Sequence, residues 1–140
     1  MKDKTSRLFD IALFALACLY FIGTRTFLRP CLNPMENGMW MTCHWAGQAL
    51  SGLACVLAVT AAMRLLIKSG SVRLGMAAAM VPEALLTALL PGNLIGVCAH
   101  EGARCVLVTR PGAIVFGVLI AILSLADALL LLSAEKKAHR

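Results

Sequence analysis

Hydrophobic residues gather in four long runs along the chain, and short polar segments separate them. The runs cover residues 8–27, 45–67, 74–95 and 113–132. Each is close to the ~20 residues that a helix needs to cross the hydrocarbon core of a bilayer. The pattern therefore predicts an all-α integral membrane four-helix bundle. Because the connectors use up the rest of the 140 residues, we expect one four-span domain over 1–140 and no separate soluble module.

Helix-breaking residues mark the ends of the predicted spans. The short polar turn at 68–71 folds the second and third spans into an antiparallel hairpin, and the Arg110-Pro111-Gly112 segment opens the fourth span. Small residues recur at four-residue spacing in both partners of this hairpin, and such residues let two helices approach closely. They are Gly47, Ser51 and Cys55 in the second span, and Gly75 and Ala79 in the third. We expect these two faces to pack against each other.

Basic residues predict how the spans are oriented. The chain is 60% hydrophobic and only 14% charged, with a net charge of +6. One side of the predicted bundle carries nine basic residues: Lys2, Lys4, Arg7, Arg64, Lys68, Arg73, Lys136, Lys137 and Arg140. The other side carries Arg25, Arg29, Arg104 and Arg110. Since Lys and Arg favour cytoplasmic segments, this asymmetry places both termini in the cytoplasm. The basic residues are not gathered on one face or tail, so no nucleic-acid partner is predicted.

The first span has an alternative interpretation as a lipoprotein signal. A basic start and an apolar stretch lead to Ala15-Leu16-Ala17-Cys18, which resembles the region around an acylated cysteine. The apolar run continues past that cysteine through Leu19-Tyr20-Phe21-Ile22. We therefore favour a membrane span here.

Four of the six cysteines fall on the predicted outer side, in the two longer connectors at 28–44 and 96–111. They are Cys31, Cys43, Cys98 and Cys105. In an oxidising compartment, four such thiols most simply form two structural disulfides, with three possible connectivities. The loop-internal pairs Cys31 to Cys43 and Cys98 to Cys105 are slightly favoured because short loops close at low entropic cost. Cross-loop pairs stay open, because Cys43 and Cys98 end two helices that are joined as a hairpin. The predicted fold is thus two antiparallel hairpins with disulfide-bearing outer loops.

The same residues allow two other interpretations. A DsbB-like thiol-disulfide membrane oxidoreductase also has four spans and two outer cysteine pairs, but such an enzyme needs a reactive pair and no Cys-x-x-Cys is present. Alternatively, a soft metal ion such as Cu(I) suits sulfur and imidazole ligands. The candidate ligands are Met39, Met41, Cys43, His44, Cys98 and His100. Their spacing is not that of an established metal motif, so we predict no metal site and no cofactor.

Ionisable residues inside the spans are the remaining candidates for function. Glu83 lies near the middle of the third span, where a charge is costly and by default indicates function or a specific partner. A protonated Glu83 that is hydrogen-bonded inside the bundle is the structural alternative. Asp10, Arg64 and Asp127 lie at similar depth near the inner ends of three spans. We expect them to form a charge cluster with a structural role.

Two cysteine-bearing blocks carry a family resemblance. They are the segment Met41-Thr42-Cys43-His44-Trp45-Ala46-Gly47-Gln48, which follows Cys31, and the segment Pro91-Gly92-Asn93-Leu94-Ile95-Gly96-Val97-Cys98, which precedes Cys105. With these blocks the chain resembles the domain of unknown function 4418 family of small bacterial membrane proteins. The resemblance implies a four-span inner-membrane protein, no assignable enzymatic activity and a contextual association with ATP-binding-cassette (ABC) transporters. Soon after the Cys-His block the family tends to have an acidic residue. This chain has Gln48 there, so it lacks that charge.

Together these observations predict a non-enzymatic small membrane subunit or accessory factor of a larger inner-membrane assembly, a transporter of the ABC type. The expected partners are the lipid bilayer and other membrane subunits, such as an ABC transporter permease, or further copies of the chain. The residues expected at polar or interface positions in the membrane are Glu83, His44, Gln48, Arg64, Asp10 and Asp127. The oxidoreductase and the metal-handling protein remain the alternatives.

Overall fold

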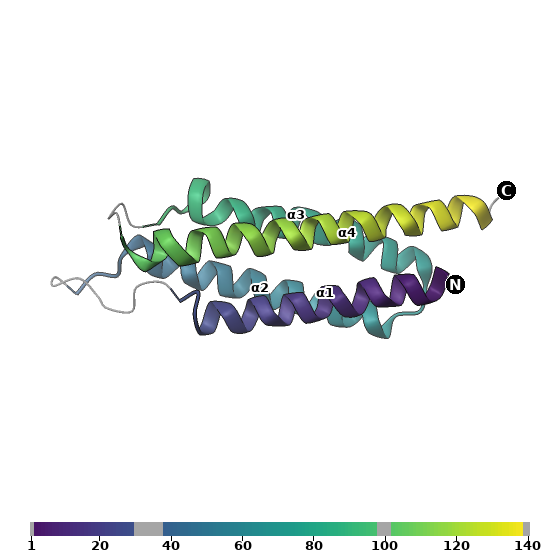
Figure 1. The fold of residues 1–140 in the computed structure, drawn as a ribbon, viewed down its shortest axis with the longest axis horizontal. Helices are drawn as coiled ribbons and strands as arrows, with labels where there is room; N and C mark the ends of the chain where they lie inside the picture. Colours follow the sequence, from purple (N-terminus) through teal and green to yellow (C-terminus); the bar gives the residue numbers. More distant parts are fainter. Residues whose placement is uncertain (1, 30–37, 98–101, 139–140) are drawn as a thin grey trace.

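The structure, a computed structural model, describes residues 2–29, 38–97 and 102–138 and contains four long helices. These are α1 (Lys2–Arg25), α2 (Thr42–Leu66), α3 (Gly70–Leu89) and α4 (Arg110–Ala138). All four run along the long axis of the molecule, and both termini lie at one end, here named the terminal end, with the opposite end named the loop end (Figure 1). Within these described ranges, four helices are long and apolar enough to cross a membrane. The chain is thus a multi-pass membrane protein, and the predicted all-α four-helix bundle is confirmed.

The helices extend beyond some of the hydrophobic runs that predict them. Helix α1 begins at Lys2 and α4 continues to Ala138, whereas the apolar runs cover only 8–27 and 113–132. The extensions contain Lys, Arg and Glu, which are good helix formers outside the bilayer. Hydropathy therefore locates the membrane-crossing part of each helix, while helix propensity sets how far the helix continues.

Prolines coincide with two π-helical turns at the loop end. The turn η1 (Leu90–Leu94) continues α3 and contains Pro91, and η2 (Cys105–Thr109) leads directly into α4, whose second residue is Pro111. Proline has no N–H to donate to the preceding helical turn, so the regular bonding pattern changes there. The helical segment of the fourth span thus begins before Pro111, not at Arg110-Pro111-Gly112 as the sequence predicts. A proline near a helix start is tolerated and does not fix the first helical residue.

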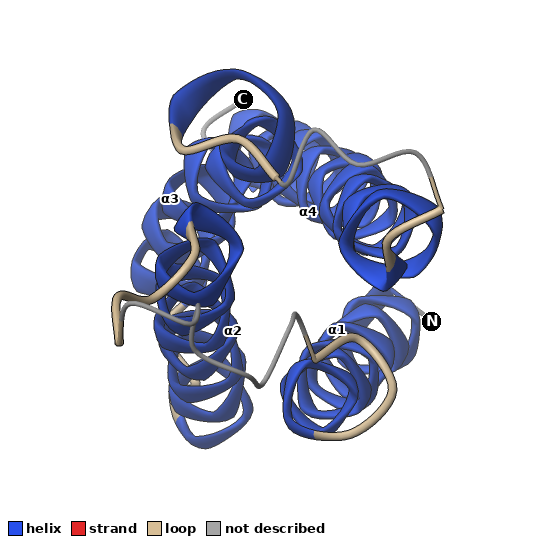
Figure 2. Cartoon of the chain, turned by 90° about the vertical axis from the view of Figure 1, so that its left-hand side faces the viewer, coloured by secondary structure: helices blue, strands red, loops and turns tan. Residues whose placement is uncertain are grey.

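The core is built from all four helices. Its central cluster takes two buried residues from each helix: Leu13 and Ala17, Leu57 and Ala61, Met80 and Ala84, and Ile120 and Ala121. Viewed from the loop end, the helices surround a common axis (Figure 2). The packing is most extensive between α1 and α2 and between α3 and α4. The large apolar side chains that remain exposed are those a bilayer would cover.

A close helix approach lies between α3 and α4. A Cβ atom built on Gly117 of α4 would lie 2.7 Å from the backbone oxygen of Ala84 and 2.9 Å from the backbone nitrogen of Ala88, so glycine is required there. On α3, Gly75 and Ala79 are exposed, and nothing lies within 4 Å of a Cβ built on Gly75. The expected packing of these two residues against α2 is therefore wrong. The four-residue spacing finds small residues, but it does not determine which way a helix is rotated about its axis.

A second close contact lies at the loop end, between the turn after α1 and the start of the fourth span. Leu28, just after α1, is buried, and a Cβ built on Gly112 of α4 would clash with its Cδ2 atom. The hydroxyl of Thr109 donates a hydrogen bond to the Leu28 carbonyl oxygen at 3.0 Å. The turn after α1 is thus fixed to the start of α4, although 81 positions separate Leu28 and Thr109 in the chain.

Candidate functional site

A network of ion pairs joins all four helices near the terminal end. Arg64 of α2 pairs with Asp127 of α4, and the same guanidinium nitrogen, Nη2, lies 2.8 Å from Oδ1 of Asp10 on α1. Arg73 in the first turn of α3 pairs with the other oxygen of that carboxylate, Oδ2. Each helix contributes one charged side chain. Two guanidinium groups therefore balance two carboxylates.

These charges are almost completely removed from solvent. The side chains of Arg64 and Asp127 are 0% exposed, that of Asp10 is 3% exposed, and that of Arg73 is 11% exposed. Burial of an ion costs several kcal/mol unless it is paired and hydrogen-bonded. Ser6 adds such bonds, because its hydroxyl donates to Asp127 Oδ1 at 3.4 Å and accepts from Arg73 Nη2 at 2.7 Å. The network is neutral and linked by side chains of the bundle itself.

The structure brings together the three residues that the sequence places at similar depth, Asp10, Arg64 and Asp127. Sequence reasoning missed Arg73, which it treats only as a marker of topology, and Ser6. The charge count was the available signal: two carboxylates and one guanidinium leave an excess negative charge inside the bundle. Because buried charges are paired, a second cation was required. Arg73 is the second basic residue after Arg64 in the sequence; Lys68 is the first.

The ion pairs of the network link the four helices to one another. Arg64 is held from three directions, since besides the two carboxylates its Nη1 atom approaches the sulfur of Met80 on α3 at 3.8 Å. Three of the four carboxylate oxygens accept a hydrogen bond from a guanidinium or hydroxyl group, and Asp10 Oδ1, which lies within ion-pair distance of Arg64, is buried without a hydrogen-bond partner in the described part of the chain. Within the described residues, no group of three or more His, Cys, Asp or Glu side chains is placed to hold a metal ion. The arrangement fixes four helices relative to one another.

Glu83 stands apart from this network, near the middle of α3. It is half-buried, and its Oε2 atom is buried without a hydrogen-bond partner in the described part of the chain. The preceding residue, Pro82, lies inside the helix. Since proline lacks an N–H, the carbonyl of Ala78 also misses its helical hydrogen bond. An unsatisfied polar group costs several kcal/mol in hydrocarbon, so the buried Oε2 atom of Glu83 destabilises this part of α3.

The outer cysteines are only partly described. Cys31 and Cys98 lie outside the described residues, whereas Cys43 at the start of α2 and Cys105 at the start of η2 are both 0% exposed. No disulfide joins any two of the described cysteines, Cys18, Cys43, Cys55 and Cys105. A cross-loop bond between Cys43 and Cys105 is thus not formed. The loop-internal pairs and the cross-loop pair Cys43 to Cys98 each include one residue outside the described part, so they stay predictions.

His44 and Gln48 lie on the first turns of α2 at the loop end. The imidazole of His44 stacks on Trp40, with 4.1 Å between ring centroids, and meets Trp45 edge-on at 5.7 Å. Gln48 is exposed one turn further along the helix. Of the other candidate metal ligands, Cys98 and His100 lie outside the described residues. The predicted interface residues therefore fall into three places: the loop end, the middle of α3, and the ion network.

Comparison with known proteins identifies a family. No curated protein and no solved structure matches the chain. A family model with the description "Domain of unknown function (DUF4418)" matches residues 13–130. The matched region runs from α1 to α4 and contains Arg64, Arg73, Glu83 and Asp127, while Asp10 lies three residues before it. Since the match covers most of the 140 residues, the chain belongs to this family, the domain of unknown function 4418 family.

Proposed function

We propose that the protein is a non-enzymatic membrane subunit that docks through α3 into a larger membrane assembly. The observation that carries this proposal is the outward face of α3. Residues three and four positions apart share one side of a helix. The residues on this side are Gly75, Ala79, Pro82, Glu83 and Leu86, of which only Glu83 is half-buried and the rest are exposed. This set is called the α3 face.

The α3 face has the chemistry of a helix-packing surface and not that of a lipid-facing one. The open space around Gly75 and the small side chain of Ala79 let another backbone come close. Small residues and interhelical hydrogen bonds drive helix association within bilayers. Glu83 adds a carboxyl group at the edge of this face; its Oε2 atom is buried without a partner in the described part of the chain, and a rotation of the side chain presents it to a docked helix as an acceptor.

The occupant of the α3 face is a transmembrane helix of a different protein, with a hydrogen-bond donor at the depth of Glu83. A second copy of the chain would place one Glu83 beside another. Two carboxylates supply no donor unless one is protonated, and like charges in a membrane repel strongly. A foreign helix that carries an Asn, Ser, His or Lys side chain satisfies the carboxyl group without that cost.

We further place this assembly in the bacterial inner membrane and assign it to a transporter of the ABC type, with both termini in the cytoplasm. The nine-to-four distribution of basic residues supports the orientation. The family resemblance supports the bacterial membrane and the transporter association. Size also favours an accessory role: the packed core of four short-looped helices leaves little width for a transport pathway through a single copy.

Photo-crosslinking in native membranes tests the docking proposal. A photoreactive side chain is placed at Ala79 on the α3 face, or at Leu129, an exposed residue of α4, as the control. We expect a crosslink from position 79 to a transmembrane helix of another membrane protein, and none from position 129. Crosslinks of equal yield from both positions, or crosslinks only between copies of this chain, would contradict the proposal.

Substitutions on the α3 face provide the matched comparison. Gly75→Leu fills the approach surface and should remove the crosslink from position 79. Gly52→Leu makes the same change at an exposed glycine of α2 that also has nothing within 4 Å of a built Cβ, and should leave it unchanged. Glu83→Gln should preserve insertion but weaken assembly, and Glu83→Leu should weaken it further. Parent-like assembly by the Glu83→Leu variant would show that the carboxyl group has no docking role.

A further inference from the structure

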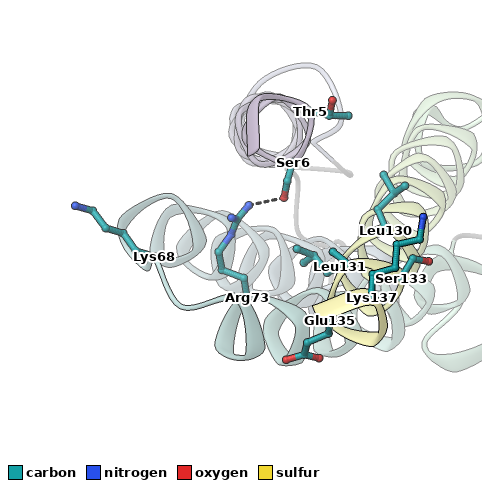
Figure 3. Close-up of a pocket in the computed structure, with 11 residues that line it drawn as sticks. Thr5, Ser6, Lys68, Arg73, Leu130, Leu131, Ser133, Glu135 and Lys137 are labelled. Atoms are coloured by element: carbon teal, nitrogen blue, oxygen red, sulfur yellow. Dashed lines mark hydrogen bonds between the residues drawn. The ribbon is translucent and has the colours of Figure 1, made fainter. Parts of the chain in front are cut away.

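A cavity of ≈ 650 Å³ opens at the terminal end of the bundle, between the start of α1, the start of α3 and the last turns of α4 (Figure 3). The residues that line it are Thr5, Ser6, Lys68, Gly70, Arg73, Leu130, Leu131, Ser133, Ala134, Glu135 and Lys137. They come from three helices and from the turn before α3. The cavity therefore exists only in the folded bundle, and it is separate from the α3 face.

The lining combines cationic and hydroxyl groups with an apolar wall. In Figure 3, Arg73 and Ser6 lie on one side, joined by a hydrogen bond, and Leu130 and Lys137 lie on the other. The Arg73 guanidinium group is bonded to Asp10 and Ser6, and its side chain is 11% exposed. The Lys68 ammonium group points away from the other lining residues in the same view. Because the charge of Arg73 is balanced by Asp10, the remaining positive charge at the cavity rests on Lys137.

The start of α3 adds backbone donors to the same place. Gly70, the first residue of α3, lines the cavity, and the preceding Ser69 forms no side-chain capping bond. The first turn of α3 contains no acidic residue. The N–H groups of a first helical turn have no partner within the helix, and together with the helix dipole they favour an anion.

We propose that this cavity binds the phosphate group of an anionic phospholipid, with an acyl chain along Leu130 and Leu131. The Lys137 ammonium group and the N–H groups at the start of α3 suit a phosphate group, and the apolar wall accounts for a lipid better than for a free ion. The cavity also lies where apolar spans give way to basic flanks, the level of the headgroups. A smaller hollow of ≈ 300 Å³ on α1 repeats the pairing of basic and apolar side chains, with Lys4 and Arg7 beside Leu8 and Ile11.

Native mass spectrometry of the delipidated full-length protein tests the lipid site. The protein is titrated with phosphatidylglycerol, with phosphatidylcholine of the same acyl chains, and with inorganic phosphate. We expect preferential retention of phosphatidylglycerol, and a loss of about five-fold in its affinity for Lys137→Gln, the effect of one cation near an anionic lipid. Lys136→Gln is the matched control, since Lys136 is the neighbouring lysine and is not part of the lining. It should retain the parent affinity.

A substitution that is expected to raise the affinity for phosphatidylglycerol provides a second test. Glu135 is the one carboxylate among the described lining residues, and Glu135→Gln should strengthen binding of phosphatidylglycerol by removing its repulsion. Equal retention of the two lipids, or equal losses for Lys136→Gln and Lys137→Gln, would overturn the proposal. Binding of inorganic phosphate without preference for phosphatidylglycerol would also overturn it and would identify a free anion as the ligand.

Discussion

Arg64 of α2 and Asp127 of α4 lie 63 positions apart in the chain and form an ion pair in which both side chains are fully buried. The pair joins two helices that are not neighbours in sequence. Asp10 contacts the same guanidinium group, so one residue connects the first, second and fourth helices. The stability of the bundle should depend on Arg64 more than on any exposed basic residue.

Replacing Arg64 tests this dependence. Arg64→Met leaves two buried carboxylates without their shared cation, and loss of one partner of a buried pair typically costs ~3–5 kcal/mol. We expect a free energy of unfolding lower by about that amount in denaturant titration of the detergent-solubilised protein. The Lys68→Met control, at an exposed basic residue near the terminal end, should change it by less than ~0.5 kcal/mol.

The double variant Arg64→Met/Asp127→Asn completes a thermodynamic cycle. Removing the second charge relieves part of the penalty left by the first, so the two effects should be strongly non-additive, with an interaction energy of ~0.5–3 kcal/mol. Additive effects would show that the two side chains do not interact energetically.

Gly117 offers a steric prediction. In Gly117→Ala the new methyl group meets the backbone of Ala84 and Ala88, and backbone cannot move aside as a side chain can. Overpacking of this kind costs ~1–3 kcal/mol, which should appear as a lowered melting temperature in detergent. Gly52→Ala enters open space and should be neutral or stabilising, because alanine favours a helix over glycine. The same melting temperature for both variants would contradict the α3–α4 contact.

The loop cysteines give a chemical prediction. We expect Cys31 bonded to Cys43 and Cys98 bonded to Cys105, each detectable as a linked peptide by mass spectrometry after alkylation without reductant. Loss of one bridge should cost roughly 2–4 kcal/mol while the four spans stay inserted. Cys18 and Cys55, which lie within α1 and α2, should remain as alkylated thiols. Full alkylation of all six cysteines before reduction would exclude the disulfides and favour the redox or metal alternatives.

Orientation in the membrane is predicted from the basic residues. Reporter domains fused after Arg140 and inserted at 69–71 should both report the cytoplasm, since nine of the thirteen basic residues flank that side. An insertion at 102–103, in the connector before η2, should report the opposite side. A signal from outside the cytoplasm at either of the first two positions would contradict the predicted orientation.

Sequence alone determined the number of helices, the approximate place of each span and the common level of three charges along the bundle. These are local properties: a run of about 20 apolar residues is long enough to cross the bilayer wherever it lies in the chain. Asp10, Arg64 and Asp127 could be assigned to one level because residue position along a helix translates into depth. The family was also readable from the two cysteine-bearing blocks.

Only the tertiary structure decided which helix faces meet. Rotation of each helix about its axis follows from packing all four together, so the small residues Gly75 and Ala79 point outward while Gly117 makes the close contact. For the same reason, the pairing of Arg73 with Asp10 and the cavity between α1, α3 and α4 depend on side chains from distant parts of the chain. Periodicity in one helix does not contain that information, because the partner of each face is set by the other three.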